Sequence, residues 1–312
     1  MSNVDTNPEL TVVVALISGH VEDLERNLDA LHRQQNPPSV EIMVPFDPPC
    51  IAVTALADRY PDVQFILAEG LDTARAREGH SREHHDTLRT IGLRAARGRI
   101  VALTEDHAVA SETWCRDMVT LLDEHPDVAA IGGAVECGSD RLINRAVYYC
   151  DFGRYQNPLS EGEAQYVSDS NVAYRREALE AIHDSWKSDY HETVVHGALL
   201  ESGREIWLTP RSTVWQVRSG LSFPPAMRER YVWGRSFAGT RVQHETAAKR
   251  LLYAGFSMVL PLLLTIRIAR GVLSKRREVL RFASSLPLIV LLQGSWSLGE
   301  FVGYLTKNPE GL

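Results

Sequence analysis

The sequence predicts an α/β fold with a mostly parallel sheet, followed by a C-terminal helical region. Short runs rich in β-branched residues alternate with helical stretches in the first part of the chain, as in units of parallel strands joined by crossover helices. The runs are apolar throughout, which is typical of strands buried on both faces. From Leu251 onward long apolar stretches dominate, so the end of the chain forms a separate region.

The elements are expected in the following order. Residues 11–17 form the first strand, and leucines at helical spacing predict a helix that ends near Gln35, before two prolines. The next expected elements are a strand over 40–44, a helix over 51–60, a strand over 63–68, a helix over 87–96, a strand over 100–103, a helix over 114–124 and a strand over 128–135. The Arg- and His-rich stretch 69–86 is either a solvated loop or a loop that closes over an anionic ligand.

Length and composition limit the function. The 312 residues suit one large α/β domain with an appendage. The net charge of −7 gives no reason to expect nucleic acid as a partner. The four cysteines show no zinc spacing and are typical of free thiols in a reducing compartment. No signal-peptide pattern precedes the first apolar run, so we expect the catalytic part to stay in the cytoplasm.

A divalent-cation site is expected where the 100–103 strand gives way to Glu105, Asp106 and His107. Ligands of open α/β sheets bind outside the carboxyl ends of the strands. Oxygen ligands that act together with phosphate oxygens suit Mg²⁺ or Mn²⁺. A solvated turn is the alternative. The first half of the chain lacks Gly-x-Gly-x-x-Gly, so no dinucleotide is expected.

Five segments, taken in order, carry a family resemblance. They are the opening strand–helix–strand that closes on Asp47, Arg89-Thr90-Ile91-Gly92-Leu93 with Ala96-x-Gly98, Leu103-Thr104-Glu105-Asp106-His107, Asp169-Ser170-Asn171-Val172-Ala173-Tyr174-Arg175-Arg176, and His191-Glu192 with Leu199-x-x-x-Gly203. Together they resemble a family 2 glycosyltransferase of the GT-A fold over roughly residues 10–240. The resemblance implies a Rossmann-like sheet and inverting transfer of a sugar from a nucleotide diphosphate donor.

The resemblance also implies a metal and a base. Asp106 and His107 are the expected metal ligands in place of the family's DxD motif, with Glu105 beside them on the donor. Glu192 is the expected catalytic base, since an inverting enzyme needs a carboxylate to take the acceptor proton. Asp189 is the fallback. Glu192 at a helix start, where acidic groups favour the dipole, is the structural alternative.

Donor binding is expected at four further residues. Asp47 is assigned to the base or ribose, and Arg89 and Asn171 to positioning of the donor, although Asn171 could simply cap or turn the chain. Arg235 belongs to the basic and aromatic stretch 230–235, which resembles a segment that closes over the diphosphate. A helix with a solvated basic edge is the alternative for that stretch.

The last fifth of the chain predicts membrane association. Residues 251–266 and 286–304 are nearly all apolar and flank a basic block, which comprises Arg267, Arg270, Lys275, Arg276, Arg277 and Arg281. The first run is shorter than the roughly 20 residues of a spanning helix, and a span would carry the basic block outside. We therefore expect residues 251–305 to lie in the cytoplasmic leaflet of the inner or plasma membrane. Two true spans, or packing on the enzyme or on a second copy in a homo-oligomer, stay open.

These observations together predict three regions and one activity. Residues 1–10 are expected to be flexible, 11–240 to form the GT-A domain and 241–312 the membrane-associated helices. The predicted activity is metal-dependent, inverting transfer of a sugar from a nucleotide sugar to a polysaccharide or lipid-linked acceptor, in synthesis of cell-envelope polysaccharide. The alternatives are a catalytically inactive GT-A-like membrane scaffold and a nucleotidyltransferase of similar fold.

Overall fold

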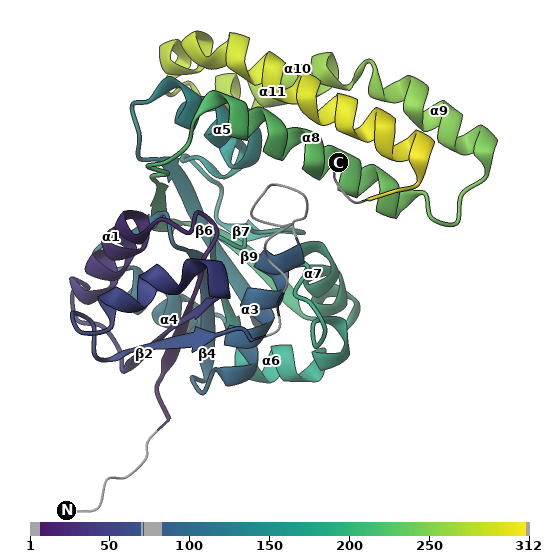
Figure 1. Ribbon diagram of the computed structural model, residues 1–312. Coiled ribbons are helices and arrows are strands. Elements are labelled where there is room, and N and C mark those ends of the chain that lie inside the picture. The colour runs from purple at the N-terminus through teal and green to yellow at the C-terminus, as the bar shows by residue number, and fades with distance from the viewer. Residues whose placement is uncertain (1–6, 70, 72–82, 310–312) are drawn as a thin grey trace, which may run out of the picture. The chain divides into compact units, whose positions relative to one another are not determined.

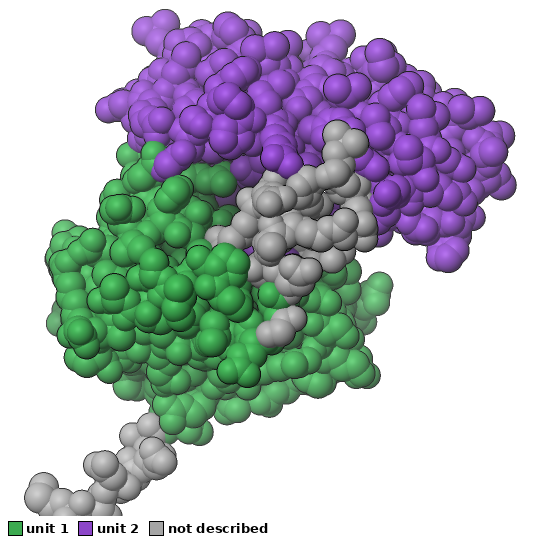
Figure 2. Space-filling model, in the orientation of Figure 1, with its two compact units in different colours: residues 1–71, 85–138, 155–219 green, residues 72–84, 139–154, 220–312 purple. Residues whose placement is uncertain are grey.

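The computed structural model describes residues 7–69, 71 and 83–309. Residues 1–6 of the expected flexible N-terminus, and most of the expected 69–86 loop, lie outside the described residues. The chain divides into two compact units, coloured separately in Figure 2. The first comprises residues 1–71, 85–138 and 155–219, and the second 72–84, 139–154 and 220–312.

A mixed sheet organises the first unit (Figure 1). Within the described residues its strands are β1 (Leu10–Ala15), β2 (Val40–Phe46), β3 (Val63–Leu67), β4 (Ile100–Glu105), β5 (Ala108–Ala110), β6 (Val128–Cys137), β7 (Gly162–Glu163), β8 (Asn171–Arg175) and β9 (Glu205–Gln216). The order is β3-β2-β1-β4-β8-β6-β9-β5, and β7 pairs with β9. The strands β3, β2, β1 and β4 run parallel, whereas β8 is antiparallel to both of its neighbours. The predicted α/β fold with a mostly parallel sheet is confirmed.

The helices of the first unit largely follow the expected order. They are α1 (Val21–His32), the 3-10 helix η1 (Pro48–Leu56), α3 (Glu83–Ala95), α4 (Trp114–Glu124), α6 (Arg176–Ala181), the 3-10 helix η3 (His183–Ser185) and α7 (Glu192–Glu201), with a short 3-10 turn η2 (Gly153–Tyr155) where the units meet in sequence. The α4 helix has the predicted bounds. The expected helix over 51–60 is instead a 3-10 helix that starts earlier, at the proline pair after Asp47.

The strand expected over 100–103 continues to Glu105. It does so because β1 pairs with β4 without a break, from Leu10 opposite Ile100 to Ala15 opposite Glu105. Both strands are completely buried. On one side of β4 the core continues through Val172 and Tyr174 of β8 to Val195 and Leu199 of α7. The α7 helix therefore packs on the same core as β4 and β8.

The second unit is helical. It contains α5 (Leu142–Asp151), α8 (Phe223–Arg241), α9 (Ala247–Ser257), α10 (Leu260–Lys275) and α11 (Val279–Thr306). The long α11 helix packs along α8 and also contacts α5, α9 and α10 (Figure 1). Within the described residues α11 alone is long and apolar enough to cross a membrane, and α9 and α10 meet the same criterion only as a pair bent by 56°.

Candidate functional site

Buried charged residues gather at the carboxyl ends of β1 and β4. The β4 strand ends at Glu105, and Asp106 and His107 follow it, all three with less than a tenth of their surface exposed. Asn27 of α1 fixes this turn, because its amide donates to the carbonyl oxygens of Glu105 at 3.0 Å and Ala108 at 2.7 Å. The motif therefore lies where β4 ends, at the carboxyl end of the strand, as expected.

The Asp106 carboxylate is held by the turn between β1 and α1. Oδ1 accepts hydrogen bonds from the backbone nitrogens of Ile17 and Ser18, each at 3.1 Å. Oδ2 accepts from the backbone nitrogens of Ser18 and Gly19, each at 3.0 Å, and from the Ser18 hydroxyl at 2.7 Å. A cluster of backbone N–H groups before a helix is where phosphates bind in many nucleotide-binding folds. Here the protein's own carboxylate takes that place.

His107 lies between the two neighbouring carboxylates. Its Nδ1 is 2.9 Å from Asp106 Oδ1, and its Nε2 is 3.5 Å from Glu105 Oε2. Burial lowers the pKa of His107, but the hydrogen bond to Asp106 and the charge of Glu105 outweigh it and raise the pKa. The pKa of Asp106 is lowered: burial acts against this shift, and His107 and Ser18 more than offset it. The two carboxylates thus favour the charged form of the imidazole in this turn.

Arg89 of α3 joins three more carboxylates. Its Nη2 lies 2.9 Å from Asp169 Oδ2 and 3.1 Å from Glu105 Oε1, and its Nη1 lies 3.4 Å from Asp86 Oδ1. The side chain is 2% exposed. Burial disfavours its charge, but the three carboxylates raise the pKa of the guanidinium further. Gln216 of β9 donates to the other oxygen of Glu105 at 3.2 Å.

Burial is also the main cause that raises the pKa of Glu105, against the opposing charges of His107 and Arg89. The arrangement links the predicted donor residues Arg89 and Glu105 to Asp169 and Asp86. Asp169 begins one of the segments that carry the family resemblance, whereas the sequence analysis did not identify Asp86. Asp86 carried a usable signal, since it precedes Arg89 by one helical turn, whereas nothing in the sequence pointed to Gln216.

The predicted base, Glu192, contacts these residues through Asp169. Glu192 is the first residue of α7 and is half-buried. Its Oε2 accepts a hydrogen bond from the backbone nitrogen of Asp169 at 3.4 Å. The preceding residue, His191, places Nδ1 3.0 Å from Asp86 Oδ2. The fallback residue Asp189 accepts a hydrogen bond from the Thr87 hydroxyl at 2.6 Å.

Asn171 is built into the sheet. Its amide nitrogen donates to the carbonyl oxygens of Ala134 at 2.8 Å and Ser212 at 3.3 Å, and its oxygen accepts from the Trp114 indole at 2.8 Å. A Cβ on Gly133 would lie 2.4 Å from this amide, so the neighbouring strand leaves no room for a side chain. Because these three bonds use the amide, Asn171 holds the Asp169–Ser170 loop in place.

The remaining predicted donor residues lie in different units. Asp47 is fully buried at the end of β2, and its carbonyl oxygen accepts a hydrogen bond from Cys50 at 2.9 Å. Arg235 lies in α8 of the second unit, where its Nε donates to the carbonyl oxygen of Asn308 at 3.3 Å. The site described here lies within the first unit, so the role expected for Arg235 stays a prediction.

The residues at the strand ends do not fit the expected metal. Both oxygens of Asp106 are already occupied by hydrogen-bond donors, and Glu105 is paired with Arg89 and Gln216. In the described part of the chain no group of three or more His, Cys, Asp or Glu side chains is arranged to hold a metal ion. A cation would have to replace several charged hydrogen bonds to reach Asp106. No step below is therefore assigned to a metal.

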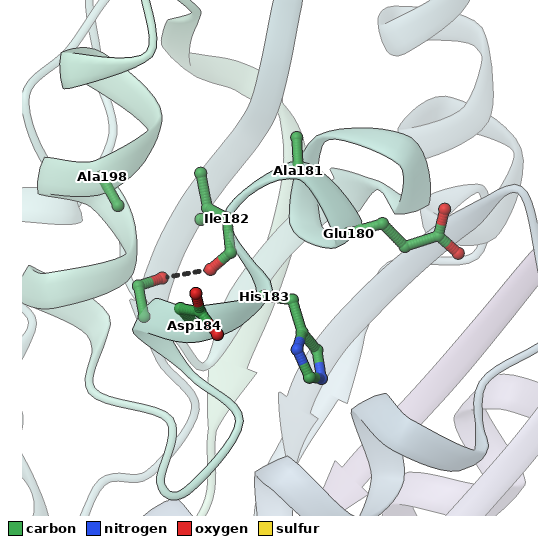
Figure 3. A pocket seen from close by; sticks show the side chains of 7 residues that line it. Glu180, Ala181, Ile182, His183, Asp184 and Ala198 are labelled. Carbon is green, nitrogen blue, oxygen red and sulfur yellow. Dashed lines mark hydrogen bonds between the residues drawn. The ribbon is translucent and has the colours of Figure 1, made fainter.

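A surface pocket lies elsewhere in the first unit (Figure 3). It is formed by α6, η3 and the second half of α7, with Glu180, His183, Asp184 and Ala198 among its lining residues. The Ser185 hydroxyl donates to the Ile182 carbonyl at 2.8 Å within it. None of the predicted site residues lines this pocket, so it adds nothing to the candidate site.

Comparisons with known proteins bear on the family. The model of glycosyl transferase family 2 matches residues 12–182, which is more than half of the chain. No curated protein was found to match. Among solved structures, residues 1–349 of TarS from S. aureus in complex with UDP align with a TM-score of 0.50 at 13% identity, over 92% of this chain and 91% of that one.

A mannosyltransferase from Pyrobaculum calidifontis, in complex with GDP-Man and Mn²⁺, aligns with a TM-score of 0.49 at 16% identity, over 91% of this chain and 75% of that one. At such identities structural likeness bears on the fold alone. The likeness to TarS agrees with the predicted GT-A fold, and the family match covers the strands and loops that form most of the site. The chain belongs to glycosyl transferase family 2 and is a glycosyltransferase.

Proposed function

We propose that this enzyme transfers a sugar from a nucleotide diphosphate donor to a hydroxyl group of a polysaccharide or lipid-linked acceptor, with inversion at the anomeric carbon. The observation that carries the proposal is the position of Glu192. Its carboxylate is half-buried and meets the backbone of Asp169, whose side chain pairs with Arg89 beside Glu105. A carboxylate that solvent can reach therefore lies next to the carboxyl ends of the strands, where the fold binds ligands.

The proposed reaction is a single displacement. Glu192 takes the proton of the acceptor hydroxyl as its oxygen attacks the anomeric carbon. The new carbon–oxygen bond forms on one face while the bond to the diphosphate breaks on the other, and the nucleotide diphosphate leaves with the bonding electrons. The buried pair of Arg89 and Asp86, with the exposed His191 bound to Asp86, holds α3 and the start of α7 together, so that the base keeps its position.

We also propose that the enzyme works at the cytoplasmic side of a membrane. The apolar helix α11 and the bent pair of α9 and α10 support membrane association. Such a location would bring a lipid-linked acceptor to the enzyme and suits synthesis of cell-envelope polysaccharide.

Two conservative substitutions test the base. Glu192→Gln should lower the transfer rate by about 10²- to 10⁴-fold, as expected for loss of a general base, while Asp189→Asn should remain active. Donor binding is followed separately by thermal shift with UDP, GDP, CDP, ADP and dTDP, since a ligand that binds only the folded state raises the unfolding midpoint. The Glu192→Gln protein should keep the shift of the wild type.

Three other outcomes would contradict the proposed function or the assignment of the base. Activity retained in Glu192→Gln and lost in Asp189→Asn would overturn the assignment of the base. A product that carries a nucleoside monophosphate would identify a nucleotidyltransferase instead. Absence of any nucleotide-induced shift in the wild type, together with no transfer, would favour the inactive scaffold.

A further inference from the structure

The second unit buries several polar side chains within its core and exposes many apolar ones. Its buried side chains include Ser257 and Ser285, both fully buried, and Gln293, Ser297 and Glu300, each 5% exposed. In contrast, Phe256, Met258, Leu262 and Leu263 of α9, α10 and the turn between them are 53–70% exposed, and Leu280 of α11 is 86% exposed. An exposed apolar surface of this extent marks an interaction site.

The helices of this unit associate through backbone contact and polar bonds. A Cβ on Gly299 of α11 would lie 2.0 Å from the carbonyl oxygen of Tyr231 on α8, and one on Gly234 of α8 would lie 2.1 Å from that of Trp296. Ser295 donates to the carbonyl oxygen of Met227 at 2.6 Å. These contacts join α11 closely to α8 within the second unit.

The exposed apolar residues of α9 and α10 form one surface with basic ends. We call this surface the α9–α10 face. It comprises Leu251, Leu252, Phe256, Met258, Val259, Leu262, Leu263 and Ile266. Lys249 and Arg250 precede it, and Arg267, Arg270 and Lys275 follow it. Positive charge at both ends suits a segment whose two ends meet the headgroups of the same anionic leaflet.

The dimensions of the α9–α10 face exclude a simple span. Its residues 251–266 would cover only about 24 Å even as a straight helix with a rise of 1.5 Å per residue, against roughly 30 Å of hydrocarbon. The two helices are also bent by 56°. A span would further place the exposed Arg267 and Arg270 inside the bilayer or carry them across it.

The α11 helix meets the length criterion, but its surroundings are not those of a span. It packs along α8, which carries four arginines and one glutamate: Arg228, Glu229, Arg230, Arg235 and Arg241. The buried side of α11 holds Glu300, which accepts a hydrogen bond from the Trp296 indole at 2.6 Å. Charged side chains of this kind face protein or water, so the side of α11 that packs on α8 does not contact lipid.

We propose that the α9–α10 face is an in-plane binding surface for one anionic leaflet, and that α11 supports it from the protein side without crossing the membrane. This inference names the membrane partner of the proposed function and rests on the proposed membrane association, but not on catalysis. The apolar residues enter the acyl region, and the basic residues at both ends meet the lipid phosphates.

Vesicle flotation of the full chain tests the surface. The wild type should float with vesicles of phosphatidylglycerol and phosphatidylcholine, and much less with phosphatidylcholine alone. The double variant Phe256→Glu/Leu262→Glu should lose flotation with both kinds of vesicle. Arg267→Gln/Arg270→Gln should weaken binding to the anionic vesicles by roughly 30-fold, since each basic residue near such a surface contributes about a factor of five.

Matched controls separate the proposal from folding and from catalysis. Leu200→Glu changes an exposed leucine of α7 in the first unit and should float as the wild type does, as should Glu192→Gln. A wild type that stays with the soluble fraction overturns the proposal. The proposal is also overturned if the wild type sediments as a dimer and fails to float, while Phe256→Glu/Leu262→Glu sediments as a monomer. A second copy of the chain would then cover the α9–α10 face.

Protease access tests the in-plane orientation. Arg276 and Arg277 are exposed between α10 and α11, so trypsin should cleave there in sealed inside-out membrane vesicles, on the same side as the catalytic unit. Fragments are identified by mass spectrometry. Protection of this position until detergent is added would show that the helix pair crosses the membrane, and would overturn the in-plane arrangement.

Discussion

Arg89 is the residue of the first unit whose removal we expect to cost most stability. Replacement by methionine keeps the length of the side chain but leaves Glu105, Asp169 and Asp86 without their shared counterion. The guanidinium is 2% exposed and lies within 3.4 Å of all three carboxylates. Removing one partner of a buried ion pair costs about 3–5 kcal/mol because the other charge stays buried. Arg89→Met should therefore lose at least this amount, a large share of a typical stability of about 5–15 kcal/mol.

Arg99 provides the matched control. It makes two hydrogen bonds of 2.7 Å to Asp123, but the two side chains are 43% and 49% exposed. An exposed pair contributes roughly 0–1 kcal/mol, so Arg99→Met should change little. Urea unfolding followed by circular dichroism and tryptophan fluorescence gives both free energies. The reasoning is refuted if Arg89→Met is destabilised no more than Arg99→Met.

The pH dependence of the stability loss in Arg89→Met shows whether unpaired buried charge causes it. Burial is the main factor that already raises the pKa of Glu105, and loss of Arg89 should raise it further. A carboxyl group with a raised pKa in the folded state lowers stability when it is ionised, and this penalty disappears as the pH falls below its unfolded value of about 4. The free-energy difference between wild type and Arg89→Met should thus be largest near neutral pH and narrow toward pH 4. A constant difference would indicate lost packing instead.

Three further predictions concern other parts of the chain. Gly299→Ala should destabilise the second unit by about 1–3 kcal/mol through overpacking. Gly294→Ala in the same helix has nothing within 4 Å of the new Cβ and should raise the thermal midpoint of the protein. Equal midpoints for the two variants would contradict the close helix contact. Burial raises the pKa of Glu41, but hydrogen bonds from Thr11 and Arg97 outweigh it and lower the pKa. The ionised carboxylate therefore stabilises the fold above about pH 4.5, and this stabilisation is lost as the pH falls through the pKa of Glu41 in the folded state. Glu41→Gln should then approach the wild type in stability only in acid, as thermal unfolding against pH would show. Asp106→Asn should lower the thermal unfolding midpoint in EDTA without any nucleotide. An amide cannot accept all the hydrogen bonds that the turn donates, and an unsatisfied buried group costs about 1–3 kcal/mol. An unchanged midpoint together with lost Mn²⁺-dependent nucleotide binding would instead support Asp106 as a metal ligand.

The parts of the fold that the sequence predicted well are those governed by local pattern. The strand beginning near Thr11 and the helix over 114–124 follow from apolar spacing alone. The long strand β9 was not predicted, since Pro210 and Arg211 interrupt its alternation and its pairing with β6 contains register shifts. The antiparallel direction of β8 was also beyond local pattern, because it depends on the course of the chain between β6 and β8.

The candidate site shows the same limit. Glu105, Asp106 and His107 are adjacent in sequence, so their position at a strand end was predictable. The partners of Asp106 were not, because Ser18 lies 88 residues away and meets it only since β1 and β4 are neighbours in the sheet. Arg89 was expected to bind an anionic ligand, but it pairs with carboxylates of the protein itself. Helical spacing could have indicated Asp86, whereas Glu105 and Asp169 reach Arg89 only through the tertiary fold.

The acidic residues of the site fall into two groups that differ in what they can do. Asp106, Glu105 and Asp169 are buried, and each is bound by backbone amides or by a cationic side chain. Glu192 is half-buried, so solvent and an acceptor hydroxyl can reach its carboxylate, and we propose that it exchanges a proton with the acceptor. Loss of activity on substitution of a buried carboxylate would therefore not by itself identify a ligand of metal or donor. Only a variant that unfolds like the wild type and still fails to transfer sugar reports on chemistry, and among these carboxylates we expect that behaviour from Glu192.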